Sequence, residues 1–276
     1  MGLTALAPVA HRVFAGEEEL EGSTVLAGGR VALHSRRSPD SSGQNEDALA
    51  LLATGESSGV LAVADGLGGA PAGQLAAAVA LESLAEAVAS AVTGDRGLRA
   101  GIMDGFERAN AAVRELGLGA GTTLTVVEVQ DGRVRPYHAG DSFVLITGQR
   151  GRIKLQTISH SPVGYGVEAG LLDESAALLH EERHLVSNAI GSVGMRIEVG
   201  SPLRLAPRDT LVMGSDGLSD NLRTDEIVGC VRRGPLVEGA ARLAALARQR
   251  MQSPEPEQPS KPDDLTFLVF RLGTAA

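Results

Sequence analysis

The feature that most constrains this chain is an apolar run that ends at one aspartate followed by glycines. The run Val60-Leu61-Ala62-Val63-Ala64 has the composition of a buried strand, and Asp65 follows it directly. Gly66, Gly68 and Gly69 then let the backbone turn sharply, so a peptide carbonyl can approach whatever Asp65 binds. Carboxylate and carbonyl oxygens are the ligands that hard divalent cations prefer. An ordinary Asp-Gly turn has the same sequence, so this stretch alone does not identify a metal site.

The same pattern of a carboxylate beside an apolar run recurs along the chain. Four further acidic clusters flank runs with strand composition: Asn45-Glu46-Asp47 before 48–52, Asp141 before 143–146, Asp216 after 211–214, and Asp263-Asp264 before 265–270. Strand ends are where a sheet brings distant residues together, so the sequence predicts a cluster of carboxylates at a sheet edge. The clusters contain neither cysteine nor paired histidine, which favours Mg²⁺ or Mn²⁺ over Zn²⁺.

At these residues the sequence resembles the protein phosphatase 2C family of metal-dependent Ser/Thr phosphatases. The family's motifs occur here in the family's order: Asn45-Glu46-Asp47, Asp65-Gly66-Leu67-Gly68-Gly69, Gly121-Thr122-Thr123, Gly140-Asp141-Ser142, Ser215-Asp216-Gly217 and Asp263-Asp264-Leu265-Thr266. The resemblance covers roughly residues 30–272. It implies an α+β fold, a four-layer α-β-β-α sandwich of two antiparallel sheets with flanking helices.

The resemblance also implies a centre of two Mn²⁺ or Mg²⁺ ions, with a third, weaker ion in bacterial members. Asp65 would bridge two ions, the Gly66 carbonyl would bind one of them, and Asp216 and Asp263 would hold the other. The full set of implied metal ligands is Glu46, Asp47, Asp65, Gly66, Asp141, Asp216 and Asp263, of which Asp65, Asp216 and Asp263 are the implied catalytic residues. For Asp141 and Asp220, a turn or helix-cap role stays an equal alternative.

The loop before the first motif departs from the family pattern. Members usually place an arginine three residues before the motif's asparagine, where it grips the substrate phosphate, and this chain has Ser42 there. Arg36 and Arg37 lie slightly earlier in the same polar loop. We expect Arg37, with Arg36 as the second candidate, to bind phosphate in place of the usual arginine. The alternative is that both are solvated surface residues.

Two functions follow from these observations. The first is a Mn²⁺- or Mg²⁺-dependent protein phosphatase that hydrolyses phosphoserine or phosphothreonine, with phosphorylated substrates of a Ser/Thr kinase as partners. The second is a phosphatase-like metal-binding regulatory protein with weak or no turnover. The acidic motifs favour the enzyme, and Ser42 favours the regulatory protein.

Composition and length limit the domain organisation, the binding partners and the localisation of the protein. A chain of 276 residues without a linker-like break is expected to form one catalytic domain over 30–276, with 1–29 as an N-terminal extension or edge strand. A formal net charge of −9 argues against nucleic-acid binding. The single cysteine, Cys230, fits a reducing compartment, and we expect a cytoplasmic protein with no membrane span.

The coarse secondary structure can be read from propensity and turn signals. Residues 72–92 and 99–116 are expected to be amphipathic helices, and 121–129 with 133–138 a hairpin around Asp131-Gly132. Residues 159–184 carry Pro162 and several glycines and are expected to form an excursion over the surface. His160, in this excursion, is expected to be structural.

Overall fold

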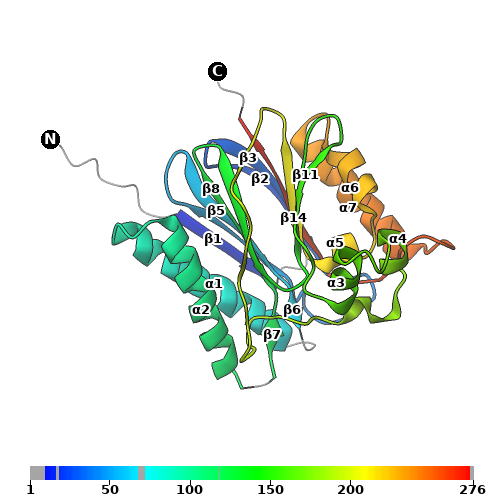
Figure 1. Cartoon of the computed structure of the whole chain (residues 1–276), viewed down its shortest axis with the longest axis horizontal. Coiled ribbons are helices and arrows are strands. Elements are labelled where there is room, and N and C mark those ends of the chain that lie inside the picture. The colour runs from blue at the N-terminus through cyan, green and yellow to red at the C-terminus, as the bar shows by residue number, and fades with distance from the viewer. Residues whose placement is uncertain (1–9, 17–18, 68–71, 118, 274–276) are drawn as a thin grey trace.

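The computed structural model describes residues 10–16, 19–67, 72–117 and 119–273. Two large antiparallel sheets pack face to face, and helices cover the outer face of each (Figure 1). The expected four-layer α-β-β-α sandwich is therefore confirmed. Gly68, Gly69 and Pro71 of the glycine-rich turn lie outside the described residues.

The first sheet has the strand order β1-β4-β5-β8-β9-β12, with β13 also paired to β9. Its strands are β1 (Ala10–Ala15), β4 (Ala48–Ala53), β5 (Ser58–Ala64), β8 (Leu124–Gln130), β9 (Arg133–Ala139), β12 (Glu198–Val199) and β13 (Leu203–Arg204). β5 lies in the interior of this sheet, as its unbroken apolar run predicts. The β8–β9 hairpin turns at Asp131 and Gly132, whose φ angles of 50° and 72° are those of the tight hairpin turn that Asp-Gly favours.

The second sheet has the order β11-β10-β14-β15-β3-β2. Its strands are β2 (Glu19–Leu26), β3 (Gly29–Arg36), β10 (Phe143–Thr147), β11 (Ile153–Gln156), β14 (Thr210–Gly214) and β15 (Leu265–Leu272). A short pair, β6 (Gly66–Leu67) with β7 (Gly121–Thr122), lies beside the first sheet's end. The strand expected over 121–129 is interrupted at Thr123. The register of β5 with β8 continues into β6 with β7, but the Asp65 N–H donates to the Thr123 hydroxyl instead of a backbone carbonyl.

Helices α1 (Ala72–Thr93) and α2 (Leu98–Glu115) cover the first sheet, and α6 (Thr224–Val231) and α7 (Leu236–Gln252) cover the second (Figure 1). The two long helices expected from the sequence are thus confirmed. The excursion contains α3 (Pro162–Glu168), α4 (Glu174–Ala177) and the 3₁₀ turn η1 (Glu181–His184). One further short helix, α5 (Asp216–Ser219), follows β14 directly.

Three apolar cores separate the four layers. One lies between α1, α2 and the first sheet, one between the two sheets, and one between the second sheet and α6 and α7. The helical pair on the first sheet packs closely: a β-carbon at Gly101 or Gly105 of α2 would press against the backbone of α1. Small residues at this contact explain how a chain with only 3% aromatic residues fills its core.

Helix α1 corrects one expectation from the sequence. At 22 residues it is long and apolar enough, by length and composition, to cross a bilayer, although no such segment was expected. In the structure, Ala76, Ala80, Leu84 and Val88 of this helix are buried against the first sheet and α2. This packing is that of a core helix.

The core between the sheets gives a stability prediction. Leu61 on β5 is 0% exposed and contacts this core, so Leu61→Ala should lower the free energy of unfolding by about 2–5 kcal/mol. The measurement is urea denaturation, in which the dependence of the free energy of unfolding on urea concentration should be the same for the variant and the wild type. The matched control is Leu171→Ala, because Leu171 is 84% exposed; that change should stay within about 0.5 kcal/mol. Equal losses for both variants would contradict the assigned core.

Candidate metal centre

The ends of five strands bring the predicted carboxylates together. Asp65 follows β5 and Asp216 follows β14. Asp47 precedes β4, Asp141 precedes β10, and Asp263 precedes β15. Burial, and then repulsion from Asp47, Asp216, Asp141 and Asp263 in decreasing order, holds the pKa of Asp65 well above its ordinary value. Residues far apart in the sequence therefore form one acidic cluster, drawn from both sheets.

The Asp65 backbone is fixed by the Gly-Thr-Thr motif. Its N–H donates to Thr123 Oγ1 at 2.9 Å, and its carbonyl accepts from the Thr123 N–H and the Thr122 hydroxyl, both at 2.8 Å. Thr123 Oγ1 lies 2.7 Å from Ser142 Oγ, which belongs to the Gly-Asp-Ser motif. The Gly-Thr-Thr motif thus holds the main chain at Asp65 through both its N–H and its carbonyl, and Ser142 of the Gly-Asp-Ser motif contacts Thr123 in turn.

A second network fixes Asp47. The Ser215 hydroxyl donates to Asp47 Oδ2 at 2.7 Å, and the Asp47 N–H donates to Asn45 Oδ1 at 3.0 Å. The Asn45 amide donates to Ser35 Oγ at 2.9 Å, and Ser35 Oγ lies 2.7 Å from Thr266 Oγ1. Burial, and next repulsion from Asp264, raises the pKa of Asp47 well above its ordinary value. The first motif is therefore tied to the Ser-Asp-Gly and Asp-Asp-Leu-Thr motifs.

Asp264 has a function that the sequence did not reveal. Its Oδ1 accepts from the Ser38 N–H at 2.7 Å and its Oδ2 accepts from the Glu46 N–H at 2.6 Å. It therefore pins both ends of the loop between β3 and β4, while its neighbour Asp263 turns to the acidic cluster. The alternation of side chains next to a strand was the available signal, since adjacent aspartates cannot face the same way.

Gly66 and Gly73 allow the chain to pass close to the first motif. A β-carbon at Gly66 would overlap the Gly73 backbone, and a β-carbon at Gly73 would overlap the Glu46 carboxylate. Glycine is thus required at both positions if Glu46 is to lie beside Gly66. The structure brings Glu46 and Gly66 together as predicted.

Lys261 is the second residue that the sequence did not reveal. Its Nζ lies 2.6 Å from Asp216 Oδ2, 2.9 Å from Asp263 Oδ2 and 3.1 Å from Asp220 Oδ2. Burial alone would lower the pKa of Lys261, but attraction from Asp216, Asp220 and Asp263 raises it above its ordinary value. Lys261 is therefore a charged ammonium against the acidic cluster.

Three carboxyls in this half of the cluster have pKa values near neutrality. Burial, and then the charge of Asp216, raises the pKa of Asp263 to about 6, that of Asp220 to about 7 and that of Asp141 to about 8. Lys261 opposes the rise in all three. Burial and the neighbouring negative charge together thus outweigh the effect of one ammonium on these pKa values.

The two candidate phosphate-binding arginines point to different places. Arg36 ends β3 on the same face as Ala32, which packs under α7, and its Nη1 donates to Glu19 Oε1 at 2.6 Å. The structure therefore does not bring Arg36 to the acidic cluster. Arg37 donates from Nη1 to the Gly43 carbonyl at 2.9 Å within the loop, and its charge lowers the pKa of Asp264, although burial leaves that pKa raised overall.

His160 belongs to a separate cluster with His138 and Glu198, whose candidate ligand atoms lie within 4.8 Å of one another. The His160 Nδ1 accepts from the Gly140 N–H at 3.1 Å and from the Asn188 amide at 2.9 Å, and its Nε2 lies 3.1 Å from Glu198 Oε2. The two imidazoles are stacked 4.3 Å apart at 14°, and His138 Nε2 lies 2.9 Å from the Ile158 carbonyl. His160 is buried and holds the residue before Asp141, in agreement with the expected structural role.

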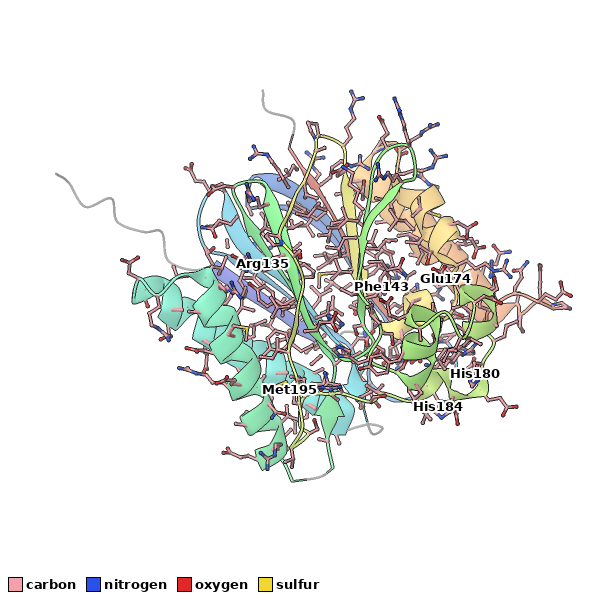
Figure 2. The ribbon with its side chains drawn as sticks, viewed as in Figure 1. Arg135, Phe143, Glu174, His180, His184 and Met195 are labelled. Carbon is pink, nitrogen blue, oxygen red and sulfur yellow. The ribbon has the colours of Figure 1, made fainter. Side chains whose placement is uncertain are left out.

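A cavity of about 880 Å³ adjoins the acidic cluster. Asp141, Asp216 and Asp220 line it on one side, and the excursion lines the other. Figure 2 labels two lining residues, Phe143 on the second sheet and Glu174 on α4. A substrate side chain can thus approach the carboxylates beneath the excursion.

The donor set fits divalent cations. The cluster consists of carboxylates and a glycine-flanked backbone segment. Burial and then mutual repulsion raise the pKa values of Asp65 and Asp47, and a bound cation would offset both effects. Oxygen donors of this kind suit Mg²⁺ or Mn²⁺.

The comparisons with known proteins agree with this geometry. The family model for protein phosphatase 2C matches residues 37–262. Protein phosphatase PhpP of Streptococcus pneumoniae is 30% identical over 176 residues, which cover 61% of this chain and 70% of that protein. A serine/threonine phosphatase of S. agalactiae superposes with a TM-score of 0.75 at 25% identity, covering 88% of this chain and 99% of that one.

A third relative adds the metal. The catalytic domain of the Ser/Thr protein phosphatase PstP, in complex with two manganese ions, superposes with a TM-score of 0.66 at 26% identity over 88% of this chain and 97% of that one. The fold, the ordered motifs and these matches together show that the chain belongs to the protein phosphatase 2C family.

The raised pKa values predict how stability depends on pH in chelator. The carboxyls of Asp263, Asp220 and Asp141 ionise near 3.8 when unfolded and near 6, 7 and 8 when folded. Between these values the unfolded state binds fewer protons, so the free energy of unfolding falls as the pH rises. The melting temperature in EDTA should therefore fall between about pH 5 and about pH 8.

Excess Mn²⁺ is the control for this prediction. It should raise the melting temperature more at the upper end of the range, because bound cations replace the protons. A melting temperature in EDTA that rises over the same range would contradict the buried acidic cluster.

Proposed function

We propose that this protein is a Mn²⁺- or Mg²⁺-dependent phosphatase that hydrolyses phosphoserine and phosphothreonine in protein substrates of a Ser/Thr kinase. The observation that carries the proposal is the acidic cluster itself, built from strand ends of both sheets around Asp65. Membership of a family whose relatives are named Ser/Thr phosphatases supports the same reaction. The manganese ions in the PstP structure support the choice of metal.

Each residue of the cluster has a distinct task in this proposal. Asp65, fixed through its backbone by Thr122 and Thr123, would bridge two ions, and Gly66 would offer its carbonyl to one of them. Asp216 and Asp263 would hold the other ion. Glu46 and Asp47 would complete or orient the ligand shells, and Asp141 would help to hold a third ion.

When bound, a pair of such ions supplies a metal-activated water at neutral pH and neutralises charge on the phosphoryl group. The chain's own part is to hold the carboxylates rigidly and to position the phosphate. Ser215 keeps Asp47 oriented, and Asp264 keeps the loop that carries Arg37 against the cluster. The cavity beneath the excursion gives the phosphorylated side chain its approach.

The alternative is a metal-binding regulatory protein with weak or no turnover. Ser42, at the position of the family's usual arginine, is the observation that favours it. Both functions predict metal binding, so only turnover separates them.

Turnover should depend on metal. Hydrolysis of p-nitrophenyl phosphate should disappear in EDTA and return with Mn²⁺ or Mg²⁺, because the donor set requires a divalent ion for charge neutralisation. The variant Asp65→Ala should remain inactive after Mn²⁺ is added, since a bridging ligand serves both ions. Calorimetry is the second measurement, and it should show loss of the tight Mn²⁺ sites in Asp65→Ala.

Activity that survives exhaustive chelation would refute the two-ion mechanism. Two unchanged tight sites in Asp65→Ala would refute the ligand assignment. Tight Mn²⁺ binding by the wild-type protein with no turnover on phosphopeptides would favour the regulatory alternative.

The phosphate grip can be tested at Arg37. A hydrogen bond to a charged group contributes about 1.5–3 kcal/mol, so Arg37→Ala should raise KM for a phosphopeptide about tenfold or more. Mn²⁺ affinity measured by calorimetry should not change. Arg36→Ala is the matched control, because Arg36 pairs with Glu19 on the opposite face, and its KM should equal that of the wild type.

Two results would argue against this grip. One is an unchanged KM in Arg37→Ala. The other is a rise in activity when Ser42→Arg restores the family's usual residue, which would show that the native loop lacks a phosphate ligand.

A further inference from the structure

Lys261 uses oxygens that a divalent ion would need. Its Nζ lies 2.6 Å from Asp216 Oδ2 and 2.9 Å from Asp263 Oδ2, and both aspartates are proposed metal ligands. An ammonium is only a donor, so each contact occupies carboxylate lone pairs. A divalent ion bound to the same carboxylates would lie close to the ammonium, so repulsion between the two positive charges makes them compete for Asp216 and Asp263.

The position of Lys261 is built into the fold. The buried Asn221 side chain accepts from the Lys261 N–H and donates to the Lys261 carbonyl, both at 2.8 Å. The same amide donates to the Gly217 carbonyl at 2.9 Å, directly after Asp216. Ser260, the preceding residue, donates from Oγ to the Arg250 carbonyl at 2.9 Å. The main chain at Lys261 and the turn carrying Asp216 thus form one rigid unit.

We propose that Lys261 is a built-in competitor of the metal, whose ammonium neutralises Asp216 and Asp263 until a divalent ion displaces it. This inference rests on the metal site of the proposed function. The apparent dissociation constant then equals the intrinsic one divided by the fraction of molecules in which the ammonium has left. If it has left in about a tenth of the molecules, the ion binds about tenfold more weakly than the ligands alone would allow.

Asp220 gives the displaced ammonium a place to remain. It lies 3.1 Å from Lys261 Nζ and is not among the proposed metal ligands. Arg183 from η1 also approaches it, with Nε at 3.9 Å from Oδ2. Displacement therefore removes two of the three ion pairs of Lys261 while a third carboxylate keeps the amine near the cluster.

The chain offers an internal reference for this displacement. Its two lysines are Lys154 and Lys261, with similar side-chain exposures of 29% and 25%. Lys154 pairs with Asp209 at 2.6 Å. Asp209 precedes β14 and Asp216 follows it, so the two lysines lie at opposite ends of this strand.

The first test is amine labelling of the wild-type protein. Reductive methylation with formaldehyde and cyanoborohydride is followed at each lysine by peptide mass spectrometry, in EDTA and in saturating Mn²⁺. The ratio of Lys261 to Lys154 modification should rise severalfold with Mn²⁺, because an amine released from two ion pairs reacts faster. A ratio that stays constant or falls overturns the proposal.

The second test measures Mn²⁺ binding by calorimetry. Lys261→Met keeps the length of the side chain and removes its charge, so it should bind Mn²⁺ about tenfold more tightly than the wild type. Lys154→Met should bind as the wild type does. Equal or weaker binding by Lys261→Met overturns the proposal, and the labelling test decides alone if this variant does not fold.

These readouts separate the inference from the proposed function. Mn²⁺ that binds and displaces Lys261 without phosphopeptide turnover would retain the inference and reject the phosphatase activity. Normal metal-dependent turnover with an unchanged labelling ratio would do the opposite. Absence of Mn²⁺ binding in both the wild type and Lys261→Met would reject both.

Discussion

The structure depends on holding several carboxylates together in a place that is largely removed from water. Burial and mutual repulsion both oppose this arrangement, as the raised pKa values of Asp47, Asp65 and Asp141 show. What keeps the groups in place is main-chain anchoring: Thr122 and Thr123 hold Asp65. The three apolar cores fix the strand ends from which these side chains project. The sandwich is thus the rigid support for a charge arrangement that would otherwise spread apart.

Much of this could be predicted from local sequence. Unbroken apolar runs marked the interior strands, the periodicity of 72–92 marked α1, and Asp131-Gly132 marked the hairpin turn. The recurrence of an aspartate at strand ends indicated one site, because strand ends of a layered fold meet at an edge. The position of Arg36 was not predicted in this way, because Arg36 was expected in the polar loop. The structure extends β3 to Arg36, and alternation from Val31 and Leu33 then places it on the face opposite the core between the sheets.

The parts that could not be predicted depend on contacts between distant residues. Lys261 follows a proline-rich loop without periodicity, and only the fold brings it to Asp216, 45 positions earlier. Asp264 binds main-chain groups 218 and 226 positions away. Side-chain alternation before β15 indicates that it points away from Asp263, but it does not indicate which groups it contacts. The interruption at Thr123 arises in the same way, because the Thr123 hydroxyl accepts from the N–H of Asp65, which lies 58 positions earlier.

These residues also show how the charge of the site is distributed. At the loop that should meet the substrate, Ser42 stands where the family's arginine is expected, and Arg37 is bonded within its own loop at Gly43. On the metal side, an ammonium contacts Asp216, Asp220 and Asp263. Positive charge therefore lies in two places, at Arg37 in the loop and at Lys261 against the proposed metal ligands. In the proposed function, the bound ions and Arg37 would together hold the phosphate, and Lys261 would balance part of the carboxylate charge while no ion is bound.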